Sequence, residues 1–418
     1  MPETGKWNWE TGCSAIQGSK NCSTEVSWLE EPCVSPDGEH IAAIAKLEDG
    51  YGVCCNGKLW DQTFEKAWNL RFSPDGRLTA IVQQDGEWTL AVDGETWPGL
   101  YSYLWKVCFS KDGKVIACAI QQDGRYGMSI DDTPWDALYI NANEFCISSG
   151  GQGTAAVVQT ENLTAADLNA FKRGVFTVAV NGRAWEQTFV NAWTPTFDHQ
   201  GQRVAAQIRL NLYDYTIAVD GIPWQDTFAC VWEPLFHPTS NEVFAPVKIA
   251  GSWGMARNGK IIWEPVFNQC WHHQFSANGK TLAAIVAPSF GIFTVAVNGK
   301  PWSSVFPVVT DLTVSDDGTT VAALASEYNT NWRIAVNGTP WTGTFDMAWK
   351  PVISSDNSHV AAKVETTGKQ TIMINGKLYK HEFHRVWDPI FSPDNSKVLI
   401  RGLDNDSYLR IVANLSDF

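Results

Sequence analysis

The chain has 418 residues, 44% hydrophobic and 18% charged, a composition that excludes global disorder and supports a large core. Lys and Arg total 31 against 45 Asp and Glu, and the resulting net charge of −14 argues against binding to nucleic acid or anionic lipid. No apolar run is long enough for a transmembrane helix, and the N-terminal residues lack a signal-peptide pattern. We therefore expect a cytoplasmic chain with reduced cysteines and no direct membrane insertion.

An aromatic motif, Trp-x-x-x-Phe, recurs along the chain and marks the first strand of a repeated unit. Its starts are 37 to 39 residues apart, except for one interval of 50. The exact, variant and degenerate copies together begin at residues 30, 68, 105, 143, 193, 232, 271, 310, 349 and 387. The sequence therefore contains ten units.

Each unit continues with the same succession of turns and strands. A polar turn such as Ser73-Pro-Asp-Gly76 follows the aromatic strand, and Pro and Gly suit the backbone angles that such a turn requires. A small apolar strand, a variable loop and a third strand come next. An Asn-Gly or Asp-Gly pair such as Asn181-Gly182 then predicts a tight hairpin, because both of its central residues need a positive φ. A second Trp-x-x-x-Phe/Tyr run, such as Trp60 to Phe64, is expected to form the fourth strand.

Four short antiparallel strands in about 39 residues are typical of a propeller blade. We expect an all-β, single closed β-propeller of about ten four-stranded blades, with residues 1–19 as an N-terminal tail and 20–418 as the propeller domain. The last unit lacks a fourth strand, so an N-terminal strand near residues 20–28 is expected to complete it. Two five-bladed propellers are the alternative, although the tight Asp220-Gly221 hairpin and the absence of a linker after unit five favour one ring.

One loop between the second and third strands is longer than the others. Residues 161–174 contain Thr164 and Asp167 at capping-box spacing and end at Gly174, which predicts a short helix. Leu163, Leu168 and Phe171 would form an apolar stripe on this insertion, and we predict that they bind a partner. The alternative is that the insertion folds back on its own blade.

Catalytic and metal-binding patterns are weak. There is no P-loop, no Gly-x-Ser-x-Gly and no Cys-x-x-Cys pair. His381 and His384 are three residues apart on an expected strand, so they should point to opposite faces and not chelate a metal. Cys54 and Cys55 are expected to be packed thiols. We expect no enzyme activity, no cofactor and no metal.

The 21 tryptophans are several-fold more than is usual. Because they recur in register, we expect most of them to pack between neighbouring blades. Electron transfer along a chain of tryptophans is the less favoured explanation.

The Ser-Pro-Asp-Gly turns after aromatic strands resemble the WD40-like (TolB-type) propeller repeat from about residue 20 to the end. The tryptophan-rich, acidic composition and the Trp-x-x-x-Phe-x-x-x-Trp run at Trp60–Trp68 resemble more closely the tryptophan-rich subunit of the Tmc transmembrane redox complex of sulfate-reducing bacteria. That resemblance implies a cofactor-free cytoplasmic scaffold, peripherally associated with a membrane. Its partners would be a cytochrome c, a cytochrome b and a heterodisulfide-reductase-like iron–sulfur subunit.

Two classes of function follow from these observations. The first is a non-catalytic interaction subunit that docks electron-transfer partners through the variable propeller face. The alternative is a stand-alone ligand- or glycan-binding propeller.

Overall fold

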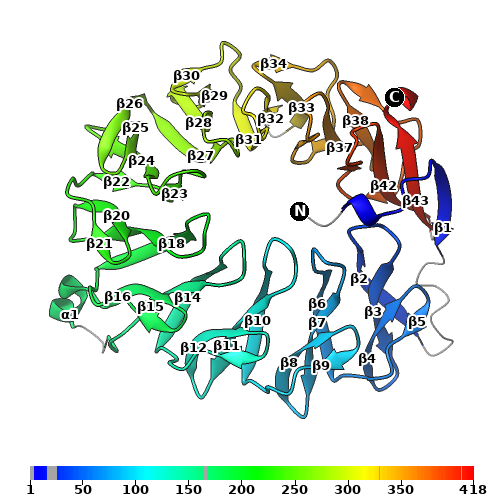
Figure 1. Cartoon of the computed structure of the whole chain (residues 1–418), viewed down its shortest axis with the longest axis horizontal. Coiled ribbons are helices and arrows are strands. Elements are labelled where there is room, and N and C mark those ends of the chain that lie inside the picture. Colours follow the sequence, from blue (N-terminus) through cyan, green and yellow to red (C-terminus); the bar gives the residue numbers. More distant parts are fainter. Residues whose placement is uncertain (1–3, 17–25, 164–166, 329, 406) are drawn as a thin grey trace. The chain divides into compact units, whose positions relative to one another are not determined.

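The chain is an all-β, ten-bladed β-propeller built from ten antiparallel sheets that follow one another along the sequence (Figure 1). The computed structural model describes residues 4–16, 26–163, 167–328, 330–405 and 407–418. We number the blades 1 to 10 in the order of their inner strands. They belong to two compact units, of which unit 1 contains residues 1–100 and 306–418 and unit 2 contains residues 101–305.

Unit 2 contains blades 3 to 7. Blade 3 consists of β10 (Tyr103–Phe109), β11 (Ile116–Gln122), β12 (Arg125–Ile130) and β13 (Thr133–Pro134), and blade 4 of β14 (Asn141–Ile147), β15 (Thr154–Gln159), β16 (Phe176–Val180) and β17 (Arg183–Ala184), with α1 (Leu168–Arg173) between β15 and β16. Blade 5 consists of β18 (Asn191–Phe197), β19 (Val204–Arg209), β20 (Tyr215–Val219) and β21 (Ile222–Pro223). Blade 6 consists of β22 (Cys230–Val231), β23 (Leu235–Phe236), β24 (Val243–Ile249), β25 (Ser252–Arg257) and β26 (Lys260–Phe267), and blade 7 of β27 (Gln269–Phe275), β28 (Leu282–Ser289), β29 (Ile292–Val297) and β30 (Lys300–Pro301).

Unit 1 contains blades 1, 2, 8, 9 and 10, with short 3₁₀ helices at Thr4–Lys6 and Leu415–Asp417. Blade 1 consists of β2 (Trp28–Val34), β3 (Ile41–Leu47), β4 (Gly50–Cys55) and β5 (Lys58–Leu59), and blade 2 of β6 (Lys66–Phe72), β7 (Leu78–Gln84), β8 (Glu87–Val92) and β9 (Glu95–Thr96). Blade 8 consists of β31 (Val308–Val314), β32 (Val321–Glu327), β33 (Thr330–Val336) and β34 (Thr339–Pro340), and blade 9 of β35 (Met347–Ala348), β36 (Val352–Ile353), β37 (Val360–Thr366), β38 (Lys369–Ile374) and β39 (Lys377–Leu378). Blade 10 consists of β40 (Arg385–Val386), β41 (Ile390–Phe391), β42 (Lys397–Asp404), β43 (Ser407–Asn414) and β1 (Gly12–Ile16).

The predicted repeat and its four-stranded blades are confirmed, whereas the alternative of two consecutive five-bladed propellers is wrong. β21 pairs with β20 of its own blade, as the Asp220-Gly221 hairpin predicts. Blades 5 and 6, where a second propeller would begin, belong to the same compact unit. Within that unit, β20 contacts β22 of the following blade.

The Asn-Gly and Asp-Gly pairs do more than reverse the chain. Asn181 and Gly182 have φ values of 48° and 77°, as a two-residue hairpin requires. The Asn181 Oδ1 atom also accepts a hydrogen bond of 2.8 Å from the Thr154 backbone N–H, at the start of the neighbouring strand. The same contact recurs in blade 2, where Leu78 N–H donates to Asp93 Oδ1 at 2.7 Å. A side-chain oxygen at this position therefore aligns the second and third strands of the blade.

The glycine of this hairpin lies against a tryptophan of the preceding blade. A Cβ atom on Gly182 would lie 3.0 Å from Trp135 Cβ, and one on Gly221 would lie 3.2 Å from Trp185 Cβ. Trp135 is buried, and its indole N–H donates a 3.0 Å hydrogen bond to Thr154 Oγ1 in the next blade. The expectation that tryptophans pack between blades is confirmed at these positions.

The outer strands differ from the prediction. In eight blades the outer strand ends just before the predicted aromatic run begins. In blade 6, by contrast, β26 includes the run from Trp263 to Phe267, which was not predicted. In blade 1, Trp60 N–H donates to Val53 O, and Phe64 then exchanges two hydrogen bonds with Tyr51. Four residues of the outer segment thus span two residues of its neighbour. This bulge interrupts the ladder, and both aromatic side chains pack in one apolar cluster, with Phe64 buried and Trp60 half-buried.

An N-terminal strand completes the last blade, as predicted, but it lies earlier in the sequence than expected. β1 pairs antiparallel with β43, from Gly12 opposite Val412 to Ile16 opposite Tyr408. β1 thus lies among the residues assigned to a tail. Most of the segment predicted to close the blade, residues 20–28, lies outside the described residues.

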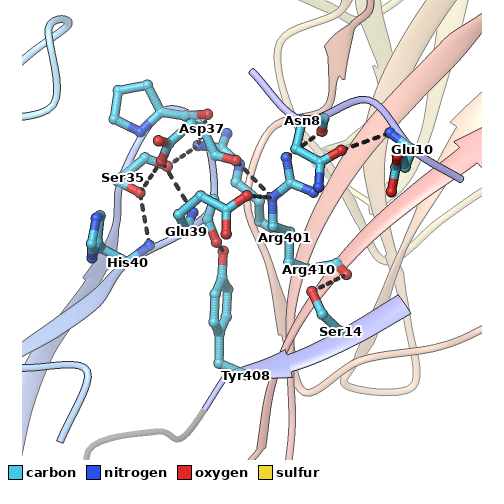
Figure 2. A network of polar contacts seen from close by, with 12 residues as sticks. Asn8, Glu10, Ser14, Ser35, Asp37, Glu39, His40, Arg401, Tyr408 and Arg410 are labelled. Carbon is cyan, nitrogen blue, oxygen red and sulfur yellow. Dashed lines mark hydrogen bonds and ion pairs between the residues drawn. The ribbon is translucent and has the colours of Figure 1, made fainter. Parts of the chain in front are cut away.

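The contact between blade 10 and blade 1 is made by a buried polar network (Figure 2). Arg401 Nη1 donates to Ser35 O at 3.0 Å, and the Tyr408 hydroxyl donates to Gly38 O at 2.8 Å. Arg410 Nε donates to a third carbonyl of the same turn, Asp37 O, at 2.9 Å and forms an ion pair with Glu39. Blade 10 is therefore fixed to the first polar turn of the chain through backbone carbonyls.

This network replaces apolar packing that other blades use at the same place. Arg401 and Arg410 are directly opposite each other on β42 and β43. The corresponding pair in blade 2 is Ile81 and Leu90, and both of those side chains are fully buried. The two arginines are also buried, so their charges depend on these carbonyl and carboxylate partners.

Candidate interaction surface

The insertion in blade 4 forms the predicted helix. α1 begins after Asp167, whose Oδ1 accepts a 2.9 Å hydrogen bond from the Ala170 backbone N–H. The N-terminal cap is thus Asp167, whereas Thr164 lies outside the described residues. The helix ends at Gly174, which has a φ of 92° and lies so close to the Phe189 backbone that a Cβ atom would not fit there. Figure 1 shows α1 beside β16.

The three predicted partner-binding residues lie in different environments. Leu168 is 67% exposed, whereas Leu163 and Phe171 are half-buried. Ala170, on the opposite side of α1 from solvent, is buried. The insertion therefore packs on its own blade, as the alternative interpretation expected. It still presents Leu168 to solvent, where a partner could contact it.

A second loop on the same side of unit 2 connects β19 to β20 in blade 5. It contains five residues, Leu210 to Asp214, where the corresponding loops of blades 2 and 3 contain two. Asn211 Oδ1 accepts hydrogen bonds from the backbone N–H groups of Tyr213 and Asp214 at 2.9 and 3.0 Å. Asn211 Nδ2 donates to Asp214 Oδ2 at 2.6 Å. This turn holds Leu212 and Tyr213 in solvent, and Tyr213 is 79% exposed.

The guanidinium of Arg209 fixes the base of this loop. Its Nε donates to Asn211 O at 3.0 Å, and its Nη2 donates to Leu212 O at 2.8 Å. The same group lies over the Tyr215 ring, 5.4 Å from the ring centroid. These contacts leave the loop few alternative conformations, so its two apolar side chains are preorganised.

A cavity of about 400 Å³ lies between the helix and the loop. Its lining contains one residue of α1, one residue just before β18 and four residues of the loop, namely Lys172, Val190, Asn211, Leu212, Tyr213 and Asp214. Most of the accessible lining is apolar. Sequence reasoning missed Leu212 and Tyr213, although the greater length of this loop was a visible signal.

The histidines that the sequence places close together do not behave as expected. Residues 379–384 are not a strand, and both His381 and His384 reach the same carboxylate. His381 Nε2 lies 3.4 Å from Asp404 Oδ2, and His384 Nδ1 lies 3.6 Å from Asp404 Oδ1. The argument that they point to opposite faces is therefore wrong. Within the described ranges, no group of three or more His, Cys, Asp or Glu side chains is arranged to hold a metal ion.

The cysteines are mostly packed. Burial raises the pKa of Cys33 to about 12 and that of Cys55 to about 11, so both thiols stay protonated at neutral pH. Cys55 is thus a packed thiol, as expected. Cys54 is disulfide-bonded, which contradicts the expectation that every cysteine is reduced.

No family model matches the chain, and no curated protein matches it in sequence. Among solved structures, a eukaryotic initiation factor is 12% identical, with 78% of this chain and 89% of that chain covered and a TM-score of 0.49. A prolyl endopeptidase is 11% identical, with 81% and 55% covered and a TM-score of 0.36. The Dos1 propeller is 10% identical, with 97% and 93% covered and a TM-score of 0.35. None of the helices in the described part of the chain is long and apolar enough to span a bilayer.

Proposed function

We propose that the chain is a non-catalytic interaction subunit that binds partner proteins through the loops between the second and third strands of its blades. The observation that carries this proposal is the pair of rigid, exposed apolar elements in blades 4 and 5. Tyr213 on the β19–β20 loop lines an apolar cavity and is 79% exposed, and Leu168, one helical turn before the cavity-lining Lys172 of α1, is 67% exposed. Apolar side chains held in solvent by a rigid scaffold are typical of protein-binding surfaces.

We further propose, from the resemblance to the tryptophan-rich Tmc subunit, that the partners are electron-transfer proteins of a membrane complex. The chain would then be peripherally associated with a membrane through a cytochrome b, a cytochrome c and an iron–sulfur subunit. It would hold no cofactor and catalyse no step.

The test is affinity purification of the tagged chain from detergent-solubilised native membranes, with mass spectrometry and a visible spectrum of the eluate. The expected result is stoichiometric co-elution of haem and iron–sulfur subunits with the wild-type chain. Replacing Asn162–Lys172 by a short Gly-Ser linker should abolish co-elution and leave the fold intact. Ile222→Ser is the matched control, because Ile222 is 72% exposed in the outer strand β21 of the same unit and follows a turn between the third and fourth strands.

Recovery of the chain alone and colourless would contradict the interaction function. A thermal shift with a small sugar or other small ligand would then favour the second candidate, a ligand- or glycan-binding propeller.

A further inference from the structure

β1 is the outer strand of blade 10, and it differs from the outer strands of the other blades. It pairs with β43 over all five of its residues without a register shift. The outer strands of eight other blades pair over two residues only. The outer strand of blade 6, β26, is longer, but its pairing is interrupted by two register shifts. β1 therefore offers the longest regular outer edge in the described part of the chain.

The other outer strands also carry residues that hinder the addition of a further strand. Four of the two-residue strands end in proline, which has no N–H to donate, and the other four each contain a charged residue. β26 contains both, with Pro265 next to Glu264. Sheets commonly protect their exposed edges in these ways. β1 has the sequence Gly-Cys-Ser-Ala-Ile, without charge or proline, and four of its five residues are exposed.

The pairing pattern of blade 10 shows which backbone groups of β1 are directed away from the sheet. The carbonyls of Leu403 and Arg401 on β42 accept hydrogen bonds from the inner side of the blade. Because alternate residues of an antiparallel strand point to opposite sides, the residues of β42 between them point toward β43. When this alternation is followed through both pairings, Gly12, Ser14 and Ile16 direct their N–H and C=O groups toward β43.

The N–H and C=O groups of Cys13 and Ala15 point outward instead. β1 is the last strand of its sheet, and these groups make no hydrogen bond to any residue in the described ranges. Two donors and two acceptors along an extended backbone are complementary to another extended strand. A helix cannot satisfy them, because its own backbone groups are already paired.

We propose that β1 pairs antiparallel with β1 of a second copy of this chain. A strand pair around a two-fold axis uses the same edge of both copies. Full overlap of the five residues places Ser14 opposite Ser14 and Cys13 opposite Ala15, so the outward groups form four hydrogen bonds. An identical strand fits this edge because the side chains are small and the pairing brings no like charges together. The proposal is independent of the interaction function proposed above.

Analytical ultracentrifugation of the full chain tests the association. Five paired residues bury less area than a stable interface needs, so the wild type should change from monomer toward dimer between about 5 and about 500 µM. Ala15→Pro should remain a monomer, because it removes an outward N–H and keeps the pairing with β43. Ser14→Lys should also remain a monomer, since it places two positive charges opposite each other. Ile222→Lys, at an exposed residue of the outer strand β21, is the matched control and should associate like the wild type.

Single cysteines on β1 report the register of the pairing. In a Cys13→Ser background, Ser14→Cys should form an intermolecular disulfide under mild oxidation with diamide, because the two Cα atoms of this pair would be about 4.5 Å apart. Ala15→Cys in the same background is the control and should not cross-link. It faces residue 13 of the second copy, and its own counterpart is more than about 7 Å away. A non-reducing gel measures both.

Three results would overturn the proposal. They are a monomer over the whole concentration range, a dimer that persists in both Ala15→Pro and Ser14→Lys, or a dimer in which Ser14→Cys cross-links no better than Ala15→Cys. The last result would indicate an exchange of β1 between two copies, which leaves the two Ser14 residues apart. If the wild type is a monomer and Ala15→Pro loses a subunit in affinity purification, the edge receives a strand of a partner protein instead, and the interaction function stands without the dimer.

Discussion

His273 lies in the inner strand of blade 7 at a position that other blades fill with apolar residues. This position is the third residue of each repeated unit. Blades 2, 3 and 8 have Leu70, Val107 and Leu312 there, and all three side chains are buried. His273 is only 8% exposed, and neither ring nitrogen makes a well-formed hydrogen bond. Burial lowers its pKa from 6.5 to about 4; the neighbouring His272 acts in the same direction, and a backbone contact with Phe244 opposes it.

This pKa shift predicts a loss of stability in mild acid. Above pH 6.5, His273 is neutral in both the folded and the unfolded chain, so the folding free energy does not depend on its titration. As the pH falls from 6.5 towards 4, the unfolded chain binds a proton that the folded chain does not, and stability is lost. A difference of about 2.5 pKa units corresponds to a free-energy loss of about 3 kcal/mol at pH 4.

We expect His273→Leu to remove this dependence. Denaturant unfolding, followed by tryptophan fluorescence between pH 7 and 4.5, should show a shallower decline in stability than the wild type. His199→Leu, at an exposed histidine, is the control and should keep the wild-type slope. Asp394 does not interfere with this measurement. Its pKa in the folded chain is about 2, so its titration changes the free energy of unfolding only below about pH 4. A wild-type slope in His273→Leu, or an NMR titration of His273 near pH 6.5, would refute the reasoning.

Three further predictions concern packing and thiol chemistry. Tyr408→Phe should lower the free energy of unfolding by about 1–2 kcal/mol, because it leaves a buried carbonyl of blade 1 without its donor, and chemical denaturation would measure this. Gly182→Ala should cost more stability than Gly57→Ala, since both have φ near +77° but only Gly182 lies against Trp135; equal losses would show that the tryptophan contact is unimportant. Among the described cysteines, Cys13 is the exposed one and should react first with iodoacetamide in the native chain, as peptide mapping would show.

The repeat could be predicted because its signals are local. An Asn-Gly pair such as Asn181-Gly182 specifies a hairpin through its backbone angles and its side-chain hydrogen bond, and both depend on residues close in sequence or one strand away. The helix in the blade 4 insertion was predictable for the same reason, since Asp167 and Gly174 cap it locally.

Contacts between distant residues were not predictable in this way. Residues 12–16 contain no blade motif, and only their pairing with β43 identifies them as the closing strand. The cavity joins two loops of different repeats, so neither loop alone indicates it. Arg401 and Arg410 did carry a signal, because they stand where other units have apolar residues, but their carbonyl partners are more than 360 positions earlier in the chain.

The pairing of β1 with β43 also has a consequence for synthesis on the ribosome. Gly12 pairs with Val412, so β1 is translated 400 residues before its partner strand. At about 5–20 residues per second, the first strand waits roughly 20–80 s before its partner has been translated. The earlier blades can form during translation, but blade 10 and its arginine contacts can form only once β43 (Ser407–Asn414) has emerged, so a chain truncated before β43 cannot complete this blade.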